Sequence, residues 1–167
     1  QPEHTDHSHS QGVILNYKTK HLQAELSQAS VGENYDAEVG YIRRRGYQLI
    51  HPSVTWLFVP NQWIVNHGPT FSSEHYFSTS FDKMEQNNTL SYIVVFKDRS
   101  EFNAGFERSF VKLELDFDPT QQYDHFLYAG TEYTYGSFIT SFQSTAKKSL
   151  SYMAEYRKGG FYNGDIQ

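Results

Sequence analysis

A strict two-residue alternation of side chains runs through residues 89–110. Leu90, Tyr92, Val94 and Phe96 form one series, which resumes as Phe102, Ala104, Phe106 and Phe110 after a polar turn at Asp98-Arg99-Ser100. Because successive side chains of a strand point to opposite faces, the pattern predicts a β-hairpin with one apolar and one polar face. We interpret the rest of the chain as further copies of this unit.

The same alternation predicts strands on both sides of this hairpin. We expect a first hairpin at 13–18 and 22–27 around Lys20-His21, then strands at 46–59, 62–81, 101–117, 125–144 and 150–157. Gly68-Pro69 predicts a bend or bulge, residues 84–88 a polar turn, and residues 31–45 and 117–124 longer loops. About eight strands joined in this way predict an all-β, antiparallel up-and-down meander that forms an outer-membrane-type β-barrel or part of one.

Composition limits the class of protein. The 167 residues have a mean hydropathy of −0.65 and contain no apolar run of the length that a membrane-spanning helix needs, although alternating barrel strands would not show such a run. The net charge of −5 and the absence of a basic stripe argue against nucleic acid as a partner. We expect residues 1–10 to be a polar, His-rich terminus or loop and residues 11–167 to be one β-domain.

Two segments carry a resemblance to a known family. They are Asn34-Tyr35 with Glu38-Val39-Gly40-Tyr41 and Arg43-Arg44-Arg45, and the closing Gly160-Phe161-Tyr162-Asn163-Gly164. The chain resembles part of the C-terminal β-barrel domain, of unknown function, in outer-membrane proteins of Gram-negative bacteria that carry an N-terminal family-9-type carbohydrate-binding module. Ala37 stands where that family typically has proline. The resemblance implies a fragment of a longer barrel and supplies no catalytic residues.

Two groups of residues are candidate metal ligands. His4, His7 and His9 lie close together in the N-terminal segment, and imidazole suits zinc or nickel. Glu114, Asp116 and Asp118 alternate toward one face of a predicted strand end, where carboxylate oxygens suit calcium. The alternatives are a terminus that binds divalent metal only adventitiously, and a solvated strand face or lumen wall. We expect no resident cofactor.

Two further groups are candidate ligand-binding residues. Arg43, Arg44 and Arg45 are suited to an anionic lipid headgroup, a sugar acid or a phosphate, or alternatively pair with nearby acids of the same loop. Trp56 and Trp63 flank the turn at Pro60-Asn61. They suit an aromatic girdle at a membrane interface, a sugar-stacking platform, or ordinary core packing.

Three functional hypotheses follow. The first is an outer-membrane β-barrel segment of a Gram-negative bacterium with a structural, anchoring or solute-passage role, whose partners are outer-membrane lipid and either carbohydrate or an outer-membrane protein complex. The second is a soluble β-sandwich or barrel that binds carbohydrate or a partner protein. The third is a glycan-acting hydrolase that uses carboxylates near Glu114 and Asp116.

Overall fold

In the computed structural model, the described part of the chain forms nine β-strands. The structure describes residues 9–36, 44–60, 63–116, 118, 126–145, 150–162 and 164–166. The strands are β1 (Ser10–Lys18), β2 (Leu22–Val31), β3 (Tyr47–Trp56), β4 (Ile64–Ser78), β5 (Lys83–Phe96), β6 (Glu101–Lys112), β7 (Glu132–Gln143), β8 (Met153–Phe161) and β9 (Gly164–Ile166).

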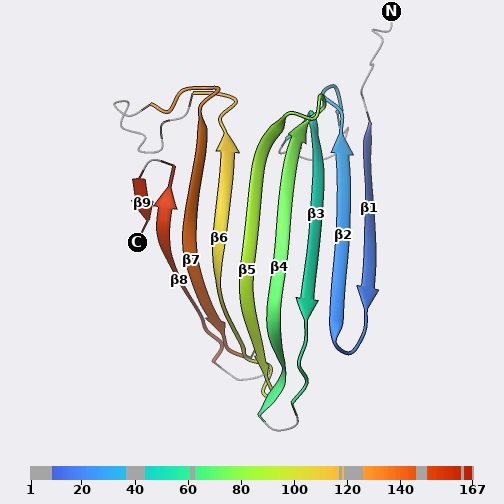
Figure 1. Cartoon of the computed structure of the whole chain (residues 1–167), viewed down its shortest axis with the longest axis vertical. Helices are drawn as coiled ribbons and strands as arrows, with labels where there is room; N and C mark the ends of the chain where they lie inside the picture. The colour runs from blue at the N-terminus through green and yellow to red at the C-terminus, as the bar shows by residue number, and fades with distance from the viewer. Residues whose placement is uncertain are drawn as a thin grey trace, which may run out of the picture.

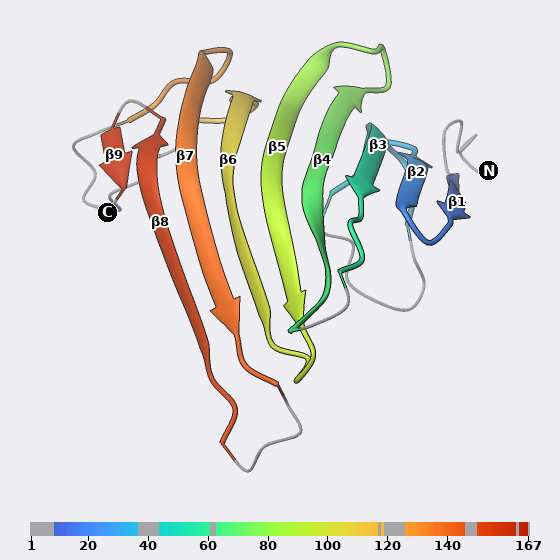
Figure 2. The same ribbon diagram turned by 60° about the horizontal axis from the view of Figure 1, so that its bottom comes forward.

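The strands form one antiparallel sheet in which each pairs only with its neighbours in the sequence. The sheet is a single curved layer, and β1 and β9 are its two edges, at opposite sides of both views (Figures 1 and 2). The predicted all-β antiparallel meander is therefore confirmed, with β9 as a strand that the sequence did not predict. The sheet is open, since β1 does not pair with β8 or β9.

Both predicted tight hairpins are present, and side chains stabilise their turns. Between β1 and β2 the hydroxyl of Thr19 accepts a hydrogen bond from the backbone N–H of Leu22 at 3.0 Å. Between β5 and β6 a carboxylate oxygen of Asp98 accepts one from the N–H of Ser100, also at 3.0 Å. An Asp or Thr side chain that bonds the backbone a few residues ahead is typical of tight turns.

Several predicted boundaries are wrong; β3 ends at Trp56 instead of residue 59, and β8 runs from Met153 to Phe161 instead of from 150 to 157. Residues 84–88 are not a turn, since β5 begins at Lys83 and the connection is at 79–82. β6 ends at Lys112 and does not continue to residue 117; beyond it, the N–H of Leu113 donates to the carbonyl of Thr131. β7 begins at Glu132, so residues 126–131 precede the strand. His125 and the turn predicted at 146–148 lie outside the described residues.

Gly68-Pro69 is not a bulge either. Both residues pair in register with β5, and the irregularities of the β4–β5 ladder lie at Ile64/Asn66 and Tyr76/Phe77. Gly68 instead allows a close approach to the neighbouring strand. A Cβ atom at this position would lie 1.8 Å from the carbonyl oxygen of Trp56, so any larger residue would force the strand ends apart.

The register assigns every side chain of β1–β8 to one of two faces with opposite chemistry. We call the continuous band of large apolar side chains on one face the apolar belt; Phe77 and Phe110 lie on the same face beyond it, toward the longer connections, and Ile64 pairs with Phe96 at its other end. Most of them are exposed, and Leu22, Val94, Phe96 and Phe142 are half-buried. The belt comprises Val13, Leu15, Tyr17, Leu22, Leu26, Ile50, Val54, Trp56, Phe71, Leu90, Tyr92, Val94, Phe96, Phe102, Phe106, Phe138, Phe142 and Tyr156.

Very little of the described chain forms a conventional core. The buried apolar side chains are Val31, Leu57, Met84, Leu113 and Leu127, and all of these lie at strand ends or in connections. The accessible surface of the chain is 12,082 Å², whereas a folded monomer of 19.4 kDa exposes about 8,500 Å². A single sheet therefore leaves its largest apolar surface uncovered, and an exposed apolar patch of this size is typical of an interaction surface.

Candidate functional site

The face opposite the belt is polar and acidic. Of the eight charged residues that β1–β8 place on it, six are glutamates: Lys18, Glu25, Glu74, Glu85, Glu101, Glu107, Glu155 and Arg157. Along β5–β7 this polar face is the less exposed of the two, although no second layer covers it; Ser109 and Ser137 are almost fully buried there. The sheet is curved (Figure 2), and side chains on its concave side crowd one another. Because the polar side chains are less exposed although no second layer covers them, we infer that the polar face is the concave side.

A groove of about 880 Å³ lies on this face near the ends of β2–β5 that carry the longer connections. Its walls combine three tyrosines with carboxylates and one arginine: Tyr35, Tyr47, Tyr76, Glu74, Glu85, Glu114 and Arg44, together with Ser10, Val31 and Asn87. The rings of Tyr47 and Tyr76 are 5.5 Å apart between centroids. A concavity with flat rings and hydrogen-bonding groups is the surface that polar ligands require.

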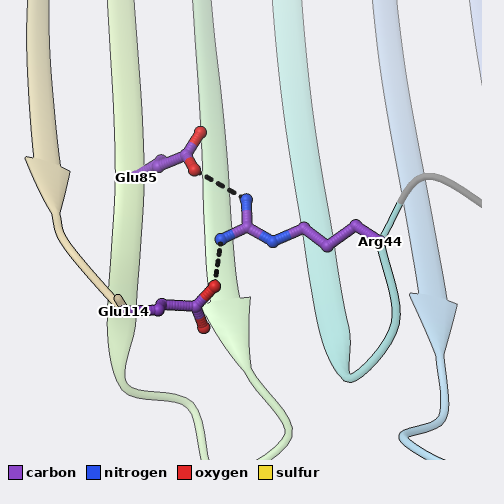
Figure 3. A network of polar contacts seen from close by, with 3 residues as sticks. All are labelled: Arg44, Glu85 and Glu114. Carbon is purple, nitrogen blue, oxygen red and sulfur yellow. Dashed lines mark hydrogen bonds and ion pairs between the residues drawn. The ribbon is translucent and has the colours of Figure 1, made fainter. Parts of the chain in front are cut away.

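Arg44 connects three distant parts of the chain in this groove (Figure 3). Its guanidinium lies 2.7 Å from a carboxylate oxygen of Glu85 at the start of β5 and 3.1 Å from one of Glu114 after β6. The same guanidinium stands over the ring of Tyr76, 5.4 Å from its centroid. The β2–β3 connection is thereby fastened across the polar face by one residue with two carboxylates and one aromatic ring.

The groove raises the pKa of two of its residues. Burial opposes the charge of Arg44, but the hydrogen bonds and charges of Glu85 and Glu114 outweigh it, so the pKa of Arg44 is raised above its ordinary value. Burial, together with the hydrogen bond and negative charge of Glu74, raises the pKa of Tyr76 from 10.0 to about 12. Arg44 therefore stays cationic and Tyr76 stays a neutral hydrogen-bonding group over the physiological range.

The pKa of Tyr76 predicts a pH dependence of stability. Because the phenol ionises at about 12 in the folded chain and at about 10 once unfolded, the unfolded state loses its proton first. The free energy of unfolding should therefore fall as pH rises from about 10 to about 12. Tyrosinate absorbance, compared between the native chain and Tyr76→Phe, should show one late-titrating phenol. A difference titration centred near 10 would contradict the prediction.

The candidate metal ligands that the structure describes do not form a cluster. Glu114 faces Arg44, whereas Asp116 accepts a hydrogen bond from the backbone N–H of Ala129 at 2.8 Å, and neither lies on a strand. His9 lies beside the hydroxyl of Ser30 at 3.4 Å. Within the described residues, which include Asp118 but not His4 or His7, no three potential ligands come together.

The remaining candidates also separate. Arg45 pairs with Asp36 at 2.9 Å on the surface, while Arg43 lies outside the described residues. Trp56 ends β3 within the apolar belt and is 51% exposed. Trp63 precedes β4 and is 82% exposed. With Phe96, Phe142 and the β5–β6 turn, Trp63 lines a second, largely apolar hollow. Both tryptophans therefore lie at the end of the sheet with the short connections, away from the groove.

Sequence reasoning missed most of the groove. It selected Arg44 and Glu114 for other reasons, and it did not select Glu74, Glu85 or Tyr47. The chain has no match among protein-family models, curated proteins or solved structures. The resemblance to the outer-membrane family therefore stays a prediction. In the described part of the chain, no helix has the length and hydropathy to cross a membrane.

Proposed function

We propose that this sheet is a segment of an outer-membrane β-barrel of a Gram-negative bacterium. The apolar belt contacts lipid, the polar face lines the interior, and the segment has a structural, anchoring or solute-passage role. One observation carries the proposal: the apolar belt extends from β1 to β8, and the opposite face is predominantly polar on β1–β7. Outward apolar and inward polar side chains are the arrangement that a barrel wall requires.

The dimensions of the belt support the same proposal. On β5 it runs from Leu90 to Phe96, six steps along the strand or about 20 Å, close to the ~25 Å apolar band of outer-membrane barrels. The two longest connections, at 32–46 and 113–131, lie at one end of the sheet together with the short turn at 79–82, and the connections at 19–21, 57–63, 97–100 and 144–152 lie at the other. Outer-membrane barrels likewise place their longest loops at one end.

The belt also crosses the sheet obliquely. At the border nearer the longer connections, the belt begins at Val13 on β1 and at Tyr156 on β8. When the paired residues are followed from strand to strand, Val13 is level with Gln86 of β5 and Tyr156 is level with Tyr92 of β5. The border thus descends by six residues, about 20 Å, across seven strand spacings, about 34 Å. A level membrane would then incline the strands by about 30°, near the 35–45° tilt of membrane barrels.

The first experiment tests whether the chain folds only in an apolar environment. Refolded into detergent micelles or lipid vesicles, it should give a β-sheet circular dichroism spectrum and a folded band that shifts in gel migration on heating. Lipids that carry a fluorescence quencher in the acyl chain should quench Trp56 and Trp63, and Trp56→Phe should show how much each contributes. A monodisperse β-protein in plain buffer with no quenching would overturn the proposal.

A second candidate function is carbohydrate binding in the groove. The observation that favours it is the pair of rings, Tyr47 and Tyr76, beside the carboxylates of Glu74 and Glu85, since sugars stack on aromatic faces and hydrogen-bond to carboxylates. Titration of a glycan panel by calorimetry tests it, with Tyr47→Ala as the variant that should lose binding. Trp63→Ala, at the other end of the sheet, serves as the control. The hydrolase hypothesis stays a hypothesis that the same panel would test.

A further inference from the structure

The charges of the strands are sorted by face. On the face that carries the apolar belt, β1–β8 place four basic residues, Lys83, Arg108, Lys112 and Lys158, and one acid, Glu132. The opposite face has six acids and two bases there, as described above. The chain is acidic overall, so this basic excess on the belt face is opposite to what its net charge of −5 would give by chance.

Two of the basic residues directly adjoin the belt at the border nearer the longer connections. Arg108 is the next outward residue beyond Phe106 on β6, and Lys158 is the next beyond Tyr156 on β8. Lys83, at the start of β5, extends over the ring of Phe110, with its ammonium 4.0 Å from the ring centroid. Neither Lys83 nor Arg108 forms an ion pair with another described residue.

A hollow of about 210 Å³ lies between these two cations. Its wall contains Lys83, Arg108, the amides of Gln86 and Asn88, the hydroxyl-bearing Thr134, and Phe110. Two cations with amide and hydroxyl donors are the groups that bind a phosphate ester. The apolar floor of Phe110 and the adjoining belt suit a ligand whose other end is hydrocarbon.

We propose that this hollow binds the phosphate of an anionic lipid headgroup at the border of the apolar belt. The inference rests on the proposed function, because the belt must be in lipid for a headgroup to reach the site. Arg108 provides two parallel donors and Lys83 a single mobile charge, while Lys158 and Lys112 add attraction for an anionic leaflet. The acidic opposite face would repel the same lipid, so the binding fixes which side of the sheet faces the membrane.

The test compares insertion into zwitterionic vesicles with insertion into vesicles that contain phosphatidic acid. The full chain should prefer the anionic vesicles, and Lys83→Gln with Arg108→Gln should reduce that preference by about 25-fold, at about fivefold for each cation. Lys18→Gln with Lys20→Gln removes the same charge at the other end of the sheet and should leave the preference unchanged. The single variant Arg108→Gln gives the same comparison with less disturbance to folding.

The outcomes separate the two proposals. Equal insertion into both vesicle types, or the same loss in both double variants, would overturn the headgroup site and leave the barrel proposal intact. If inorganic phosphate at matched ionic strength abolishes the preference for anionic vesicles, the site binds a free anion instead of a lipid. Failure of the wild-type chain to insert into either vesicle would overturn the barrel proposal itself.

Discussion

Val94→Arg is expected to destabilise the chain folded in lipid by about 2–4 kcal/mol, the cost of an arginine on the lipid face near the middle of a membrane barrel. Val94 lies in the middle of the belt on β5, between Tyr92 and Phe96, and its side chain points to the apolar face. The guanidinium would lie in hydrocarbon with no water and no counter-ion within reach. Urea titration of the chain in vesicles, monitored by tryptophan fluorescence, measures the loss.

The control for this substitution is the neighbouring residue. Val95 has the same side chain and the same strand, but it points to the polar face, where its partner on β6 is Glu101. Val95→Arg should therefore change the free energy of unfolding by less than about 1 kcal/mol, as an exposed ion pair does. If the two variants lose equal stability, or if Val95→Arg loses more, the belt does not face lipid and the proposed orientation of the sheet is wrong.

Arg44→Met is expected to cost about 1–2 kcal/mol of unfolding free energy and to loosen the β2–β3 connection from the polar face. The estimate lies between the values for exposed and buried ion pairs, because Arg44 and Glu85 are 25% and 32% exposed. Removal of the arginine also leaves two carboxylates close to each other without a cation. Urea unfolding gives the total, and proteolysis within residues 32–46 reports the loosening.

Arg45→Met is the matched control for this second prediction. Arg45 and Asp36 are 47% and 81% exposed, so their ion pair should contribute little. A double-mutant cycle of Arg44→Met with Glu85→Gln should show a coupling of about 1 kcal/mol. Equal losses for the two arginines, or a coupling near zero, would show that the Arg44 network is an ordinary surface contact.

The sequence was informative where the belt is, and misleading beyond it. Residues 90–96 were predicted as a strand because Leu90, Tyr92, Val94 and Phe96 share one face, whereas the opposite face carries Ser91, Ile93 and Val95. Residues 85–88 belong to the same strand, but both of their faces are polar: Glu85 and Asn87 face the groove, and Gln86 and Asn88 line the outer hollow. In a strand with two polar faces, apolar residues do not recur at every second position, so its sequence resembles that of a turn.

The opposite error occurred after β6. Leu113 and Leu115 continue the alternation of the strand, yet Leu113 is buried in the connection and Leu115 is 78% exposed. Alternation predicts faces and does not predict where hydrogen bonding to a neighbour stops. The Arg44 network was beyond reach for a different reason. Its residues are 41 and 70 positions apart, and no pattern in a single sequence relates them.

The topology of the sheet has a consequence for how the chain acquires its structure. Every contact between strands joins neighbours in the sequence, so no pairing has to close a loop longer than residues 113–131, and pairing between such neighbours is fast. The edge of β1, nine exposed residues with a single lysine, offers unpaired N–H and C=O groups throughout this process. In the proposed barrel, closure then requires this edge to pair with a strand distant in the sequence, and until it does, any strand, including one from another copy of the chain, competes for it.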